Sequence, residues 1–202
     1  ADESSLALDG FLVFADEPKA AARDSLAQMA TLGIEVKVAT GDNPRVAEKV
    51  CAELGLASKG TVTGAEMDTL DDAGFDDVAQ NHTIFARISP EQKARLIVSA
   101  RRTGRSVAFL GDGVNDALAL HAADVGISVD TAADVAKDAA DVVLLEKDLG
   151  VLAAGVAEGR RIFANTIKYV LMGTSSNFGN MFSAAAASAV LTFLPMLPSQ
   201  IL

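Results

Sequence analysis

The sequence predicts an α/β fold with a parallel sheet, followed by one long helix. The first observation is that short apolar runs alternate with helical patterns, as they do in strand–helix–strand units. The second is an acidic glycine turn, Gly111-Asp-Gly-Val-Asn-Asp116, directly after an apolar run. The third is that residues 169–202 contain no Asp, Glu, Lys or Arg. We therefore expect an α/β domain over 1–147, a long helix over 148–194 and a turn over 195–202.

The composition limits the classes of function. The 202 residues carry 27 acidic and 17 basic side chains, a net charge of −10, which argues against nucleic-acid binding because that function needs a basic surface. Cys51 is the single cysteine, so an internal disulfide is impossible and a reducing compartment fits. The first residues have neither an initiator Met nor the pattern of a signal peptide, so we expect the chain to be cut from a longer protein.

The first part of the chain predicts alternating strands and helices. Gly33 and Gly55 end helical patterns in the way typical of helix C-termini. The region Thr61–Asp77 is the least regular, and we interpret its five aspartates as a solvated face. The expected strands are Gly10–Phe14, Ile34–Ala39 and Thr83–Ala86, and the expected helices are Lys19–Leu32 and Asn43–Leu54.

The second part continues the alternation. Ser89, Pro90 and Gln92 form the pattern of a capping box that opens a helix, which we expect to run to about Thr103. The apolar run Val107–Leu110 predicts a buried strand before the central turn. Beyond the turn we expect a helix over Ala117–Ala123, strands over Asp124–Val129 and Asp141–Leu145, and a short helix from about Ala132.

The long helix begins with an amphipathic pattern over Asp148–Lys168 and continues into uncharged residues, Tyr169–Leu194. At about 1.5 Å per residue the uncharged part is roughly 39 Å long, enough to span a bilayer with some tilt. Arg160, Arg161 and Lys168 precede it, which predicts a cytoplasmic location for residues 1 to about 168. The alternative is a helix buried in a core or in an oligomer interface.

The central turn is the first candidate site. It places the carboxylates of Asp112 and Asp116 at the carboxyl end of a strand, where open α/β sheets bind ligands. Two carboxylates so close repel each other unless a cation neutralises them, and hard oxygen ligands suit Mg²⁺ with a phosphate. The alternative is a turn in which Asp and Gly serve only the backbone geometry.

Two further segments add to this site. Thr40-Gly-Asp42 follows an expected strand and offers a hydroxyl and backbone N–H groups to a phosphate, and Lys93 in the first turn of its helix offers a cation. With the carboxylates for Mg²⁺, this is the equipment for phosphoryl transfer. Taken singly, Thr40 is more often a helix cap and Lys93 a solvated charge. The sequence contains no Walker-type P-loop.

These segments resemble a known family. Thr40–Asp42, Ser89–Lys93 and Gly111–Asp116 resemble the second, third and fourth motifs of the haloacid-dehalogenase superfamily, and more narrowly the phosphorylation domain of P-type cation-transporting ATPases. The run Phe193–Pro198 and the Ser-Asn-Phe-Gly-Asn run look most like the magnesium-transporting branch. The similarity continues toward the family's fifth membrane helix through three more runs: Ala122–Ser128, Gly159–Asn165 and Thr174–Asn180.

The resemblance implies a role for each matching residue. Asp112 would ligate Mg²⁺ with support from Asp116, and Lys93 would neutralise phosphoryl charge. The other implied roles are phosphoryl binding by Thr40 and Gly41, ordering of the loop by Asp42, loop or phosphate contacts by Asn115, and contact with the transported ion by Asn177 and Asn180. For the two helical Asn residues, helix–helix hydrogen bonding is an equal alternative.

The chain also departs from the family. It lacks the Asp-Lys-Thr-Gly-Thr run that carries the phosphorylated Asp. Leu118 stands where Pro is usual, and Glu17 stands within a usual Asp-Pro-Pro. We therefore expect a HAD-like, Rossmann-like sheet without its first-motif strand. It would be an inactive fragment of an ATP-driven pump, most simply for Mg²⁺, with the rest of the polypeptide and the lipid bilayer as partners. The alternatives are a soluble HAD-type phosphatase remnant and a non-catalytic module that binds Mg²⁺ or phosphate.

Overall fold

The computed structural model describes residue 10, residues 20–191 and residue 193. The chain divides into two compact units, Ala1–Gly150 and Val151–Leu202. The first unit contains the α/β elements, and the second consists of most of one long helix. The expected strand Gly10–Phe14 and the expected turn over 195–202 lie outside the described residues.

The first half of the α/β unit follows the predicted alternation, with shorter strands. Helix α1 ends where Gly33 adopts a φ of +70°, as expected. The strand expected over Ile34–Ala39 is limited to its last two residues, because only these pair with a neighbouring strand. The elements are α1 (Ala20–Thr31), β1 (Val38–Ala39), α2 (Pro44–Glu53), β2 (Thr61–Thr63), α3 (Gly64–Met67), α4 (Asp72–Asn81) and β3 (Ile84–Ala86).

The region Thr61–Asp77 contains β2, α3 and the start of α4, so it is more regular than expected. Four of its five aspartates are exposed, as the interpretation as a solvated face predicts. Its aspartates cap and anchor helices. Asp71 accepts a hydrogen bond from the N–H of Gly74 at the start of α4, and Asp76 accepts hydrogen bonds from Ser99 and Arg102 on α5. The caps of α3 and α4 are therefore local, while the contacts of α4 with α5 come from partners more than twenty residues away.

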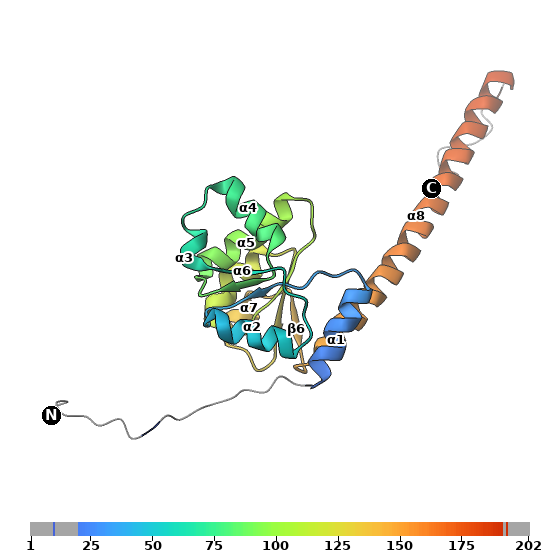
Figure 1. Ribbon diagram of the computed structural model, residues 1–202. Helices are drawn as coiled ribbons and strands as arrows, with labels where there is room; N and C mark the ends of the chain where they lie inside the picture. Colours follow the sequence, from blue (N-terminus) through green and yellow to red (C-terminus); the bar gives the residue numbers. More distant parts are fainter. Residues whose placement is uncertain (1–9, 11–19, 192, 194–202) are drawn as a thin grey trace. The chain divides into compact units, whose positions relative to one another are not determined.

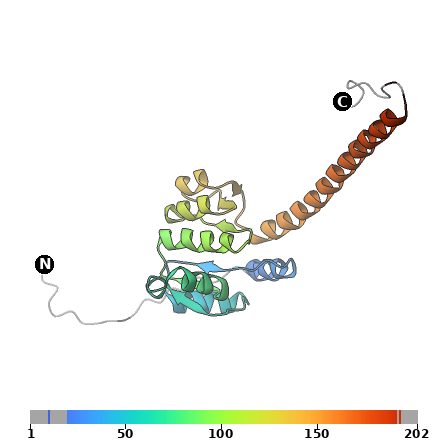
Figure 2. The same ribbon diagram turned by 90° about the horizontal axis from the view of Figure 1, so that it is seen from above.

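The second half begins with α5 (Pro90–Arg102), whose capping box is formed as predicted. Ser89 Oγ accepts from the Gln92 N–H at 3.2 Å, and Gln92 Oε1 accepts from the Ser89 N–H at 2.9 Å. The remaining elements of this half are β4 (Ala108–Leu110), η1 (Val114–Asp116), α6 (Ala117–Ala122), β5 (Val125–Val129), α7 (Asp134–Asp138) and β6 (Val142–Leu144). Helices α5 and α6 lie side by side (Figures 1 and 2).

All strand pairs among the described residues are parallel, as predicted, but they form two sheets of three strands. One sheet has the order β1-β3-β2, with Phe85 of β3 opposite Ala39 and Val62. The other has the order β4-β5-β6, with Ile127 of β5 opposite Leu110 and Val142. Within this part of the chain, each sheet therefore ends in strands that are paired on one side only.

Strand β4 is an edge strand, which corrects the expectation that it is buried. Within the described residues it pairs only with β5, and Leu110 is 42% exposed. The apolar run Val107–Leu110 predicted a strand with neighbours on both sides, because such composition is typical of the interior of a parallel sheet.

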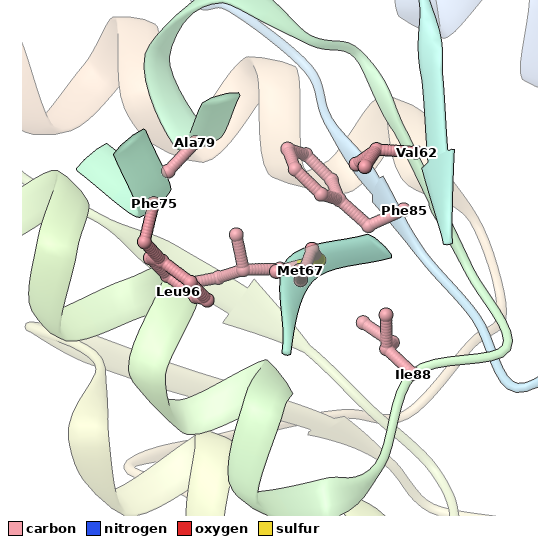
Figure 3. Packing of buried hydrophobic residues seen from close by; sticks show 7 residues of the cluster. All are labelled: Val62, Met67, Phe75, Ala79, Phe85, Ile88 and Leu96. Carbon is pink, nitrogen blue, oxygen red and sulfur yellow. The ribbon is translucent and has the colours of Figure 1, made fainter. Parts of the chain in front are cut away.

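The largest apolar cluster packs against the first sheet (Figure 3). Phe85 of β3 and Phe75 of α4 are each 1% exposed, and Met67 of α3 is fully buried. The buried members are Val62, Met67, Phe75, Ala79, Phe85, Ile88 and Leu96. A cluster of smaller side chains, Leu120, Ala136 and Ala139, lies beside the second sheet.

An ionic cluster joins the segments that precede β1, β2 and β4. Glu35 lies 3.4 Å from Lys37, 3.0 Å from Lys59 and 2.5 Å from Arg105. The hydrogen bond from Lys59, with Lys37 and Arg105 beside it, lowers the pKa of Glu35 to about 2. Because these residues come before their strands, the cluster ties the two sheets together at their amino-terminal edge.

The long helix α8 (Leu149–Val190) has 42 residues, close to the predicted 148–194. Among the described residues, no helix combines the length and hydropathy needed to cross a bilayer, so the expected span over Tyr169–Leu194 is not supported. The segment lacks charge, but it is rich in amide and hydroxyl groups, including Asn177 and Asn180, which lower its mean hydropathy. A lack of charge is therefore not the same as apolarity in this helix.

Candidate phosphoryl and magnesium site

The Thr40–Asp42 loop after β1 is stabilised by hydrogen bonds between its own residues. Thr40 Oγ1 accepts from the Asp42 N–H at 3.1 Å and donates to Asp42 Oδ2 at 3.0 Å. The loop is exposed, with Gly41 at its tip. The N-cap of α2 is Asn43, which accepts from the Arg45 N–H, so Thr40 is not a helix cap.

The same loop is bonded to the backbone that leaves β3. The N–H of Ile88 donates to the Thr40 carbonyl at 3.2 Å, and the N–H of Arg87 donates to the Asp42 carbonyl at 3.1 Å. Arg87 has a φ of +52°, a conformation that non-glycine residues seldom adopt. The Thr40–Asp42 loop therefore lies directly beside the start of α5, which carries Lys93.

Lys93 forms a largely buried ion pair with Asp116. The Lys93 Nζ is 2.7 Å from Asp116 Oδ1, and the two side chains are only 12% and 13% exposed. Asp116 Oδ2 also accepts from the Gly113 N–H at 3.1 Å, so both oxygens of this carboxylate are engaged. The ion pair connects the start of α5 to the Gly111–Asp116 loop. Because both oxygens of Asp116 are bonded within the protein, this side chain supports the loop.

The Gly111–Asp116 loop is held rigidly by its backbone. Gly111 donates its N–H to Ile127, and its carbonyl accepts from the fully buried Ser128 Oγ at 2.9 Å. A Cβ on Gly111 would lie 2.6 Å from the Cβ of Asp116, so only glycine fits there. Sequence reasoning missed the role of Ser128, whose only signal was a hydroxyl within an apolar strand.

Asp112 is the open carboxylate of the site. Its backbone carbonyl accepts from the Ala133 N–H at 3.0 Å, while its side chain is 65% exposed. Asn115, in η1, is also exposed. Sequence reasoning also missed Lys147, whose Nζ lies 3.5 Å from Asp112 Oδ2. Thirty-five residues separate this pair, so no local pattern could predict it.

The donor set fits Mg²⁺ only in part. No group of three or more His, Cys, Asp or Glu side chains in the described part of the chain could hold a metal ion. Mg²⁺ keeps several waters and is commonly held by one or two carboxylates with a phosphate. Asp112 suits that mode, and the remaining ligands would have to come from a phosphate and from outside the described residues.

The predicted site residues divide into two sets. The loop at Thr40–Asp42, Lys93 and the loop at Gly111–Asp116 are linked by the backbone and ion-pair contacts above, so they share the carboxyl-terminal edge of the sheets. Asn177 and Asn180 lie three residues apart on α8 and are exposed. A hollow of about 500 Å³ borders Arg87 and the start of α5, but none of the predicted site residues lines it.

Parallel strands with polar loops at their carboxyl ends define this part of the chain as an α/β protein, and the comparisons place it in a family of hydrolases. Residues 1–124 match the family described as haloacid dehalogenase-like hydrolase, and the chain belongs to that family. It is 52% identical over all 202 residues to the magnesium-transporting ATPase, P-type 1, of Escherichia coli (strain K12). It is 50% identical over 201 residues to the protein of the same description in Salmonella typhimurium (strain 14028s).

The chain spans 22% of the length of these two relatives. Among solved structures it resembles a zinc-transporting PIB-type ATPase in the E2.Pi state. That match has a TM-score of 0.67 and 25% identity, and it covers 86% of this chain and 24% of the other. The predicted resemblance to P-type ATPases and the HAD-like fold are thus confirmed.

Proposed function

We propose that this chain is part of a P-type ATPase that uses ATP to move a cation, most simply Mg²⁺. In this proposal the chain supplies the magnesium and phosphate loops of the phosphorylation domain. The observation that carries the proposal is the 52% identity with a magnesium-transporting ATPase over the whole chain. The common edge shared by the three polar segments supports it physically, because phosphoryl transfer depends on positioned charges.

In this proposal each loop has one task. Asp112 holds Mg²⁺, which when bound neutralises phosphoryl charge. Thr40 and Gly41 offer the phosphoryl group a hydroxyl and a backbone N–H, once Thr40 Oγ1 turns its proton from Asp42. Lys93 contributes positive charge, and its ion pair with Asp116 fixes the position of both residues. Asn115, exposed on η1, contacts phosphate or steadies the loop.

The phosphorylated residue has to come from elsewhere in the whole protein. The sequence has no Asp-Lys-Thr-Gly-Thr run, and β1 and β4 each have an unpaired side among the described residues. A parallel strand that pairs with these edges would bring its carboxyl end between the loops that follow β1 and β4. This geometry supports the proposal that a strand carrying the acceptor Asp completes the sheet.

The transport role concerns the second unit. Because the relatives are described as transporting ATPases, we propose that the whole protein acts at a lipid bilayer with residues 1 to about 168 on the cytoplasmic side. Asn177 and Asn180 lie three apart, on one face of α8, and are proposed to contact the transported ion. This part rests on the relatives and on the residue spacing.

The decisive test is acid-stable phosphorylation by radiolabelled ATP. We expect the 202-residue chain to incorporate no label, because it lacks the acceptor Asp, and the whole protein to form a phosphoenzyme. In the whole protein, Asp112→Asn should lower Mg²⁺-dependent turnover by about 100-fold or more, since electrostatic stabilisation of this kind is worth several kcal/mol. A matched control is Asp72→Asn, which removes a carboxylate that is 82% exposed.

Two results would contradict the proposal. Labelling of the isolated chain would mean that the phosphorylated residue lies within it. Near-normal turnover of Asp112→Asn would remove Asp112 from magnesium binding.

A further inference from the structure

Lys147 lies in the short linker between β6 and α8, two residues before the first residue of the helix. Its ammonium group is 3.5 Å from Asp112 Oδ2, and the two side chains are 49% and 65% exposed. Asp112 is the carboxylate that the proposed function assigns to Mg²⁺. A lysine therefore occupies the charge environment that a divalent cation would need.

Asp112 and Lys147 differ in how freely they can move. The backbone at Asp112 is held in place, because it is bonded to Ala133, Ile127 and Ser128. Lys147 has a flexible four-carbon stem, is half exposed, and belongs to a linker between a strand and a helix. When a second cation approaches Asp112, the side chain that moves is Lys147.

The largely buried pair of Lys93 and Asp116 behaves differently. These two side chains lie 2.7 Å apart and are nearly buried, so separating them would leave an uncompensated charge in the protein. The Lys147–Asp112 pair is longer and open to water, and exposed pairs of this kind contribute little to stability. Of these two ion pairs, only Lys147–Asp112 can separate at little cost in free energy.

We propose that Lys147 is a displaceable counter-ion that competes with Mg²⁺ for Asp112 and sets the magnesium affinity of the site. The inference rests on the proposed magnesium role of Asp112. When Mg²⁺ binds, the ammonium group leaves the carboxylate, since a monovalent and a divalent cation repel each other at this distance. Occupancy of the site is thereby communicated to the β6–α8 linker, and the site fills only at a higher Mg²⁺ concentration than Asp112 alone would require.

The test is calorimetric titration of the whole protein with MgCl₂, because the whole protein supplies the Mg²⁺ ligands that the described part of this chain does not contain. Lys147→Gln should lower the Kd for Mg²⁺ by about 3- to 10-fold, the range expected for removal of one partly exposed charge. Lys49→Gln is the matched control, because it removes the same charge from an exposed pair with Glu53 on α2, and its Kd should equal that of the unchanged whole protein. Asp112→Asn should abolish binding both alone and in combination with Lys147→Gln.

A second readout follows the lysine itself. Brief acylation with acetic anhydride, analysed by mass spectrometry, should modify Lys147 faster when Mg²⁺ is present, because the released amine is no longer paired. Lys49 should react at the same rate with and without Mg²⁺. In Asp112→Asn the reactivity of Lys147 should be high and independent of Mg²⁺.

The outcomes separate the two proposals. Unchanged Mg²⁺ binding in Asp112→Asn, or no binding by the unchanged whole protein, overturns the magnesium assignment of the proposed function. Loss of binding in Asp112→Asn together with an unchanged or raised Kd in Lys147→Gln overturns the role of Lys147 alone. Acylation of Lys147 that Mg²⁺ slows or leaves unchanged also overturns it.

Discussion

The two three-stranded sheets are built from the same parallel strand–helix units, yet they are packed by side chains of different size. The first sheet is covered by Met67, Phe75 and Leu96, with Phe85 in its central strand. The cluster at the second sheet contains Leu120 and two buried alanines. The first sheet thus contributes most of the apolar burial, while the second carries the loop with Asp112.

Small residues let the backbone of the second sheet approach its helices closely. A Cβ on Gly126 of β5 would lie 2.7 Å from the carbonyl oxygen of Leu120 on α6. Polar anchors then fix the strands: Asp124 accepts from the Val107 N–H at 2.9 Å, and Asp141 accepts from the Gly126 N–H at 2.8 Å. Large apolar side chains therefore stabilise the first sheet. Close backbone packing and hydrogen bonds to aspartate side chains stabilise the second.

The largest expected effect tests this contrast directly. Phe85→Ala should destabilise the α/β unit by about 4 kcal/mol, because a large side chain with 1% exposure leaves a cavity. Leu120→Ala, with the same exposure, should cost only about 2–3 kcal/mol, since its neighbours are small and its volume is lower. Urea denaturation followed by circular dichroism measures both. Equal or reversed costs would show that the two sheets do not differ in this way.

The next effect concerns the polar anchoring of the second sheet's loop. Lys93→Met should cost about 3 kcal/mol, because it leaves the nearly buried Asp116 carboxylate without its cation. Adding Asp116→Asn should restore part of that stability, which a denaturation-based double-mutant cycle measures. If the single and double variants are equally unstable, the two side chains are not coupled and the loop is anchored by other contacts.

The smallest effect concerns the ionic cluster that joins the two sheets. The pKa of Glu35 is about 2 in the folded chain and 4.5 in its ordinary state, so its contribution is present above pH 4.5 and lost as the pH falls toward 2. Two of its partners are more than half exposed, so we discount the contribution for solvent screening to about 1–2 kcal/mol. Glu35→Gln should therefore flatten the loss of stability between pH 4.5 and 2, as acid titrations of the folded fraction would measure.

The control for this experiment is Glu53→Gln. Glu53 forms a longer, more exposed pair with Lys49 at 3.7 Å. Its removal should leave the loss of stability between pH 4.5 and 2 unchanged. If the Glu35→Gln variant and the unchanged chain lose stability equally as the pH falls, Glu35 is excluded as the source of that stability.

The sequence predicted the parts of the fold that local chemistry decides. The capping box at Ser89, the helix end at Gly33 and the parallel strand–helix alternation are each encoded within a few residues. It missed α3 and α4 although their caps are local: Thr63 and Glu66 form a capping box at α3, and Asp71 caps α4. Distant partners add to this, such as Gln92, which donates to the Gly64 carbonyl and to Asp68. It also overestimated the hydropathy of α8.

The candidate site was predicted in its composition but not in its pairing. The sequence named Lys93, Asp112 and Asp116 without indicating that Lys93 contacts Asp116 or that Lys147 approaches Asp112. Side chains 23 and 35 positions apart meet only once the chain has folded. The roles assigned to all of the site residues, including the two Asn residues of α8, stay predictions.

The sides of β1 and β4 that have no partner strand among the described residues have a practical consequence for the handling of this chain. Each presents a row of N–H and C=O groups that another extended segment can bind, and exposed strand edges promote self-association. A concentrated sample will therefore tend to form intermolecular sheets, and dilution or a short peptide of strand-forming sequence will oppose that clustering.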